Sequence, residues 1–278
     1  MSALVKRTTQ KIEPTMLIVI ALLLVLIVVG SLANRRFRTP QNFTNVLEQS
    51  AVLGFVSLGQ NLVILTGGID LSIGSMINLT SSLTSGLIDG NPGRVAPVVV
   101  GILLLGLAAG ALNGLLIVGL RIHPMIITLG MSSILQGATL IYTLMPPGKV
   151  PRSFENFAFG RVLGIPYGTI IMLVLFVVVG LMLTKFRLGR YIYAVGGNPD
   201  GARLSGISNE QVLVFVYAMC GFFAALTGVY LVSRLGIGDP RAGQGYELAS
   251  ITPVTWWSVE HFRPEAKAGC GGHCWGFC

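Results

Sequence analysis

Long apolar runs that contain no Asp, Glu, Lys or Arg dominate the pattern of this sequence. Three of them cover residues 95–120, 162–184 and 211–233, with lengths of 26, 23 and 23 residues. An α-helix needs about 20 predominantly apolar residues to cross the hydrocarbon core of a bilayer. The pattern therefore predicts a polytopic membrane protein whose spans are helices.

The apolar runs and the breaks between them predict an all-α membrane bundle of about seven spans. The first run, residues 16–33, is 18 residues long. It exceeds the roughly 7–15 apolar residues of a secretory signal, so we interpret it as a retained span. We expect a cytoplasmic amino terminus, residues 1–14, followed by one transmembrane domain, residues 15–253. The predicted spans are residues 15–33, 46–66, 70–88, 95–120, 124–145, 166–184 and 211–233.

The least regular part of this pattern is the segment LTGGIDLSIGS, residues 65–75. Each glycine in a helix interior costs about 1 kcal/mol, so Gly67 and Gly68 predict a break at residues 67–69. Asp70 is the one acid in the long apolar stretch around it. One interpretation is that Asp70 caps the next helix near the interface. The other is that an ionisable group at membrane depth marks a functional site.

The orientation of the spans follows from counting them. Residues 185–210 carry four basic side chains and are the best cytoplasmic candidate, which also places the amino terminus inside. Seven basic residues then lie outside and eight inside, so the positive-inside rule adds little. If Gly67 and Gly68 do not separate two spans, the amino terminus moves to the other side.

Composition supports a membrane protein and excludes several other classes. Charged residues are 11% of the chain and hydrophobic residues 53%, while the net charge is +8. The basic residues are scattered between apolar spans, which favours loop anchors and lipid headgroup contacts over a nucleic-acid partner. The only Gly-Lys pair, Gly148-Lys149, lacks the glycine that a P-loop requires at position 143. We find no metal-ligand cluster and no Ser-His-Asp set in the spans, so no catalytic residues are predicted.

Several polar residues lie within the predicted spans without forming a ladder of acids suited to a proton relay. Individually, such side chains are most often interhelical hydrogen-bonding groups. Together they also suit a path for a polar, uncharged solute, and both interpretations stay open. Gln60 and Gln136 belong to this polar set. The candidate path or structural residues are Gly67, Gly68, Asp70, Ser72, Asn61, Asn78 and Asn113.

The polar segment between the last two predicted spans, residues 186–212, is the most specific local signal. Gly196-Gly197 and Asn198-Pro199 are turn dipeptides. A short helix is expected from Asp200 to Leu204, ending at Gly206. Ser208, with Gln211 three residues on, predicts a capping box that opens the next span. A short helix placed between two spans on the cytoplasmic side is typical of a docking element.

Four segments together give the chain a resemblance to a known family. They are LTGGIDLSIGS (65–75), AGALNGLLIVGLRIHPMIITLGM (109–131), GRYIYAVGGNPDGARLSGI (189–207) and GYELASI (245–251). The chain resembles the permease subunit of bacterial ABC importers for monosaccharides, of the ribose, xylose and arabinose type. The resemblance implies an inner-membrane protein with three kinds of protein partner: a second permease copy, ABC ATPase subunits that bind the ATP, and a periplasmic sugar-binding protein. It also makes residues 185–210 the coupling loop, with docking residues Gly196, Gly197, Asn198, Ala202, Arg203 and Gly206.

The resemblance stops after Pro253, where the composition shifts to charged residues, Cys and Trp. We expect residues 254–278 to be an aberrant tail of a truncated or frameshifted product that lacks the last spans of the family. A rival interpretation is a metal site made of Cys270, His273, Cys274 and Cys278.

These observations lead to one main functional prediction and three alternatives. The main one is a permease that passes a sugar through a polar path while partner subunits hydrolyse ATP. An ion-gradient-driven transporter would need ion-coordinating groups near the bilayer midplane, where Asp70 is the single candidate. A membrane-embedded enzyme would need convergent catalytic groups, which the spans lack. The third alternative is a truncated, non-functional permease.

Overall fold

The computed structural model describes residues 14–162 and 164–253, with side chains from residue 18 onward. The chain divides into two compact units, Met1–Val46 and Leu47–Cys278. The first unit holds α1 (Pro14–Ala33), the short 3₁₀ helix η1 (Arg35–Arg38) and the start of α2 (Pro40–Leu65). The described apolar side chains of α1 are exposed around the helix, which suits contact with lipid on all sides.

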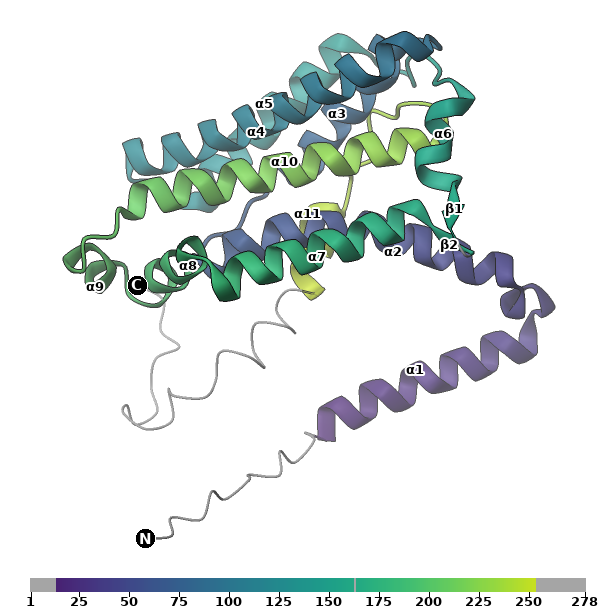
Figure 1. Cartoon of the computed structure of the whole chain (residues 1–278), viewed down its shortest axis with the longest axis horizontal. Coiled ribbons are helices and arrows are strands. Elements are labelled where there is room, and N and C mark those ends of the chain that lie inside the picture. Colours follow the sequence, from purple (N-terminus) through teal and green to yellow (C-terminus); the bar gives the residue numbers. More distant parts are fainter. Residues whose placement is uncertain (1–13, 163, 254–278) are drawn as a thin grey trace, which may run out of the picture. The chain divides into compact units, whose positions relative to one another are not determined.

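The second unit is built almost entirely of helices (Figure 1). Two short strands, β1 and β2, pair antiparallel with Arg161 opposite Pro166. The elements after α2 are α3 (Ile73–Ile88), η2 (Pro92–Arg94), α4 (Val95–Leu120), α5 (Pro124–Tyr142), α6 (Arg152–Phe159), β1 (Arg161–Val162), β2 (Ile165–Pro166), α7 (Tyr167–Lys185), α8 (Arg187–Gly197), α9 (Pro199–Leu204), α10 (Asn209–Leu235) and α11 (Tyr246–Ala249).

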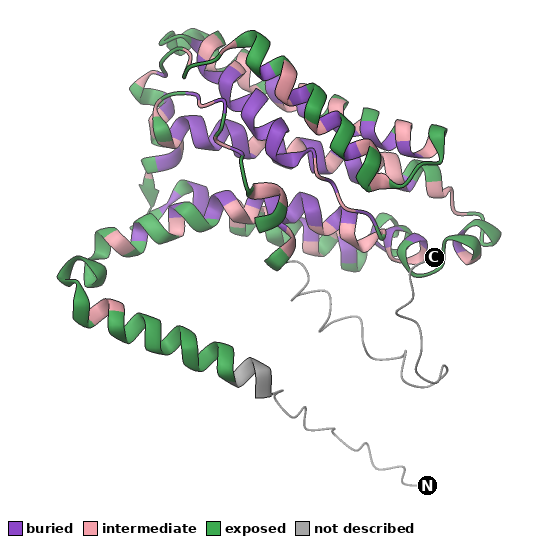
Figure 2. Ribbon diagram, turned by 180° about the vertical axis from the view of Figure 1, so that it is seen from behind, coloured by how far each residue is buried: buried purple, intermediate pink, exposed green. Residues whose placement is uncertain are grey.

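Helix α10 is the central element of this unit. In its most apolar stretch 67% of the residues are buried, compared with 17–22% in the corresponding stretches of α4, α5 and α7. Figure 2 shows this concentration of buried residues. Its 27 residues make it about 40 Å long. It packs most extensively against α4 and then α3, begins beside α8 and α9, and contacts α6 toward its other end. These two ends are called the α9 end and the α6 end.

Small residues allow α4 and α10 to approach each other closely. Gly106, Gly110 and Gly114 recur every four residues along α4, on the face that meets α10. A Cβ atom on Gly110 would lie 3.0 Å from the Cα atom of Ala218 and would collide with the carbonyl oxygen of Tyr217. Close backbone approach at small residues is a common way to pack helices where lipid removes the hydrophobic driving force.

The predicted helical membrane bundle is confirmed in its class, while the number of spans stays a prediction. Among the described residues, four helical segments are long and apolar enough to cross a bilayer: Pro92–Leu120, Pro124–Tyr142, Tyr167–Lys185 and Asn209–Leu235. The predicted span 70–88 corresponds to the 16-residue helix α3, which begins inside the bundle. Residues 152–159, between the fifth and sixth predicted spans, form α6. The fifth predicted span ends at Tyr142, three residues earlier than expected.

We expect Gly110→Val to lower the stability of the protein by about 1–3 kcal/mol, because the added side chain overpacks the contact between α4 and α10. The measurement is the melting temperature of the detergent-solubilised protein. Gly119→Val is the matched control, since it lies on the same helix and a Cβ atom there meets nothing within 4 Å. Equal melting temperatures for the two variants would contradict the packing described for these helices.

Candidate functional site

The junction between α2 and α3 is an irregular segment inside the bundle. The predicted break at residues 67–69 is confirmed, and the non-helical segment extends from Thr66 to Ser72. Gly67 has a φ of +81°, which favours glycine. A Cβ atom on Gly68 would collide with the hydroxyl oxygen of Tyr217, so a larger side chain does not fit there. The prediction that Asp70 caps α3 is wrong, because the N-cap residue is Ser72.

Asp70 instead organises the residues that precede the helix. Its side chain is 1% exposed. Its Oδ1 atom accepts hydrogen bonds from the backbone N–H of Ser72 at 2.8 Å and from the Ser72 hydroxyl at 2.6 Å. The Nδ2 atom of Asn113 on α4 donates to the Ser72 hydroxyl oxygen at 2.9 Å. Asp70 thus lies in the protein interior, and its predicted depth in the membrane stays a prediction.

The same junction is held to α5 by one threonine. The hydroxyl oxygen of Thr128 accepts from the backbone N–H of Leu71 at 3.1 Å, and the hydroxyl group donates to the carbonyl oxygen of Ile69 at 3.4 Å. Backbone polar groups away from water need such partners, because each unsatisfied one costs several kcal/mol in a membrane interior. Thr128 therefore substitutes for the helical hydrogen bonds that the junction lacks.

Polar contacts continue along α3 on the side that faces α5. The hydroxyl groups of Ser75 and Ser132 are 2.7 Å apart. Asn78 donates through Nδ2 to Oε1 of Gln136 at 2.8 Å, and its Oδ1 atom accepts from the backbone N–H of Gly243 at 2.6 Å. Together with Asp70, Ser72, Asn113 and Thr128, these residues form a continuous set of polar side chains on α3, α4 and α5. This set is called the α3 polar cluster.

The structure brings most of the predicted path residues into or beside this cluster. Gly68, Asp70, Ser72 and Asn113 meet at the start of α3, and Asn78 follows in its second turn. Asn61 lies on α2, and no described hydrogen bond joins it to the cluster. The sequence analysis missed Thr128 and Ser132. Their spacing with Gln136 at every fourth residue of an apolar span is the signal that would have found them.

Some polar atoms near the junction have no hydrogen-bond partner among the described residues. They include Oδ1 of Asn113, the hydroxyl group of Tyr217 and both side-chain polar atoms of Gln60. All three side chains are 1% exposed or less. Buried polar groups are usually paired, so unpaired ones point to water or a ligand that the protein accommodates.

The second candidate site is the pair of short helices α8 and α9, at the α9 end of α10. The predicted short helix is confirmed as Pro199–Leu204. Asn198 caps it by accepting the backbone N–H of Gly201 at 2.9 Å, and Gly206, with a φ of +80°, reverses the chain behind it. The predicted cap of α10 is also present, since the Ser208 hydroxyl oxygen accepts the N–H of Gln211 at 3.4 Å.

The surface and the base of this helix pair differ in character. Ala202 is buried, whereas Arg203 is exposed and Leu204 is 90% exposed. At the base, a Cβ atom on Gly196 would collide with the carbonyl oxygen of Leu65, and it would lie 3.3 Å from the Cα atom of Thr66. The exposed apolar tip thus belongs to α9, while α8 rests directly on the end of α2, where the irregular junction begins.

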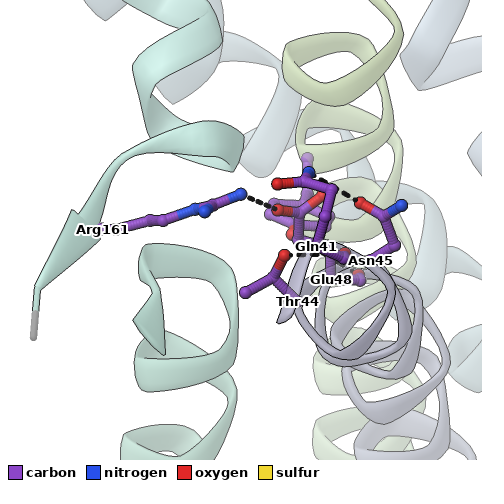
Figure 3. A network of polar contacts seen from close by, with 6 residues as sticks. Gln41, Thr44, Asn45, Glu48 and Arg161 are labelled. Carbon is purple, nitrogen blue, oxygen red and sulfur yellow. Dashed lines mark hydrogen bonds and ion pairs between the residues drawn. The ribbon is translucent and has the colours of Figure 1, made fainter. Parts of the chain in front are cut away.

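An ion pair lies at the α6 end of the bundle. The Nη2 atom of Arg161 is 3.9 Å from Oε1 of Glu48, whose side chain is only 2% exposed (Figure 3). The Tyr230 hydroxyl group on α10 also donates to the carbonyl oxygen of Glu48 at 3.4 Å. These contacts tie β1, α2 and α10 together at this end.

Among residues 14–162 and 164–253, no three His, Cys, Asp or Glu side chains gather in a way that would hold a metal ion. The rival metal site on Cys270, His273, Cys274 and Cys278 and the expected aberrant tail lie outside the described residues. The same is true of the predicted cytoplasmic segment up to residue 13.

Comparison with known proteins identifies relatives over most of the chain. The family model described as "Branched-chain amino acid transport system / permease component" matches residues 42–254. The ribose import permease protein RbsC of Escherichia coli strain K12 is 40% identical over 237 residues, which are 84% of this chain and 74% of that protein.

Two further relatives agree with this match, whereas no solved structure matches the chain. RbsC of Bacillus subtilis strain 168 is 39% identical over 84% of this chain and 73% of its own length. The D-allose transport system permease protein AlsC of Escherichia coli strain K12 is 36% identical over 88% of this chain and 76% of its own. The chain is therefore a multi-pass inner-membrane protein and belongs to the family of branched-chain amino acid transport system permease components.

Proposed function

We propose that this chain is the permease of an ATP-driven importer and that it transports a monosaccharide. The relatives are named as permeases for ribose, D-allose, fructose and L-arabinose. The α3 polar cluster suits such a solute, because Ser, Thr, Asn and Gln side chains both donate and accept hydrogen bonds to hydroxyl groups. The path comprises this cluster and the predicted residues Asn61, Gly67, Gly68, Asp70, Ser72, Asn78 and Asn113.

The single observation that carries the coupling part of this proposal is the geometry of α8 and α9. Leu204 exposes an apolar side chain beside the positive charge of Arg203 on a short, well-capped helix. An ATPase subunit that offers an apolar groove with an acidic rim would bind this surface. Gly196, Asn198, Ala202 and Gly206 shape the helix pair, while Gly197 and Arg203 lie on its surface.

The contact between Gly196 and Leu65 provides the route from the ATPase to the solute path. A shift of α8 would displace the end of α2, and residues 66–72 would carry that displacement to Asp70 and the start of α3. This chain supplies the path and its partner supplies the energy, so ATP binds to the ATPase and not to the permease. A periplasmic binding protein delivers the sugar at the α6 end, and two permease copies, each with seven spans and a cytoplasmic amino terminus, complete the importer in the lipid bilayer.

We expect Arg203→Glu to weaken co-purification of the ATPase subunit with the permease by about tenfold or more, because it reverses the charge that faces the ATPase. A change of this size corresponds to about 1.4 kcal/mol. The measurement is the ratio of ATPase to permease after affinity purification from membranes. Arg94→Glu is the control, since Arg94 is also an exposed arginine but lies in η2, before α4. An unchanged ratio for Arg203→Glu would refute docking at α9.

The neighbouring glycines of α8 offer a sharper test of the transmission route. Gly196→Ala places a Cβ atom against the Leu65 carbonyl group, whereas a Cβ atom at Gly197 meets nothing within 4 Å. We expect Gly196→Ala to reduce, by severalfold, the stimulation of ATP hydrolysis by the sugar-loaded binding protein, with little effect from Gly197→Ala. Both variants are measured in reconstituted vesicles. Equal stimulation in the two variants would mean that the contact with α2 plays no part in coupling.

A further inference from the structure

After α10 the chain does not continue outward but returns into the bundle along α3. Gly236, with a φ of +75°, ends α10. The backbone N–H of Asp239 then donates to the hydroxyl oxygen of Ser81 at 3.1 Å, and the backbone N–H of Gly243 donates to Oδ1 of Asn78 at 2.6 Å. Glu247 reaches Gly74, in the first turn of α3. Residues 239–247 thus run back along α3 from Ser81 to Gly74, a distance of about 10 Å along the helix.

This returning segment is non-helical over residues 236–245 and lies at the depth of the α3 polar cluster. Its amide groups are satisfied partly by tight turns, such as Ala242 N–H to the Asp239 carbonyl group at 3.2 Å and Gln244 N–H to the Arg241 carbonyl group at 3.1 Å. Non-helical backbone at membrane depth persists where protein buries it or where it lines a water-filled space. Interrupted helices near the midplane often form solute sites in transporters.

Two unpaired acceptors belong to side chains that contact the start of α3, where this segment ends. The Oε2 atom of Glu247 is buried against Gly74 and has no hydrogen-bond partner among the described residues. Asn113 is 1% exposed and is directed at the N-cap residue by its bond to Ser72, yet its Oδ1 atom is also unpaired. The N-cap residue makes no side-chain capping bond. The first turn of a helix carries amide groups without helical partners and a partial positive charge.

We propose that the start of α3, with Glu247 and Asn113, is a binding site for a neutral solute rich in hydroxyl groups. The Glu247 carboxylate and the Asn113 carbonyl oxygen accept hydrogen bonds from the hydroxyl groups, and the first-turn amide groups donate to the solute oxygens. The missing side chain at Gly74 gives the Glu247 carboxylate its access to the helix end. This inference rests on the proposed function and assigns a role to GYELASI, residues 245–251, that the coupling geometry leaves unexplained.

The test uses the complete importer in vesicles, with ribose and its monodeoxy analogues as probes. Glu247→Gln keeps the size of the side chain but removes the charged acceptor. We expect ribose uptake to fall about tenfold, which is the effect of losing one hydrogen bond to a charged group. We also expect discrimination against one of the deoxy analogues to fall by a similar factor. Because every variant meets the same binding protein, the selectivity of that protein cancels in the comparison.

Asn113→Asp is the second variant; it keeps the size of the side chain and should shift selectivity toward a different deoxy analogue, and it also removes the Nδ2 donor to the Ser72 hydroxyl oxygen. Ser133→Ala on α5 is the control and should behave as the wild type, since that exposed side chain bonds to the Leu129 carbonyl oxygen of its own helix. The proposal is overturned if Glu247→Gln retains normal uptake and selectivity, or if uptake falls with selectivity unchanged. Failure of the proposed function is separately visible, since the wild-type importer would then show no ATP-dependent uptake of ribose, D-allose, fructose or L-arabinose, which would overturn both.

Discussion

The requirement that every buried backbone group have a hydrogen-bond partner governs the interior of this protein. Residues 66–72 and 236–245 are non-helical segments that pack against the helices of the bundle. Thr128, Ser81 and Asn78 satisfy their amide groups from neighbouring helices. Both segments approach the first half of α3, so the polar residues that hold the backbone there are the same ones that we propose as the solute path.

The close approach of α10 to its neighbours explains how the two ends of the bundle can act together. Gly110 lets α4 rest on the backbone of α10, and Gly228 does the same for α3, because a Cβ atom there would lie 3.1 Å from the Ile77 carbonyl oxygen. Interfaces packed at this density move as units instead of deforming continuously. The proposed transmission from α8 to the α2–α3 junction would use the contact between Gly196 and Leu65, while Glu48 and Arg161 hold α2 at the α6 end.

The sequence predicted the features that depend on local chemistry. Charge-free runs located the long helices, Gly67 and Gly68 located the break, and turn residues defined α9 and the cap on α10. The bonds between Asp70 and Ser72 are local, but the sequence did not show that Asn113 would reach Ser72, because that contact depends on the packing of α4 against α3. The returning segment after Gly236 was also missed. Its contacts with Ser81 and Asn78 join residues more than 150 positions apart in the chain, and no local pattern encodes them.

Coupling to ATP hydrolysis separates this importer from an ion-driven transporter, in which the buried Asp70 beside the start of α3 would coordinate the ion. The most direct test is ribose uptake into vesicles that contain the permease and its ATPase, with the binding protein added. If ATP hydrolysis drives transport, uptake requires ATP hydrolysis and the binding protein, and it persists when ionophores collapse the proton and sodium gradients. Uptake that proceeds without the ATPase and stops with the ionophores would contradict ATP-driven transport.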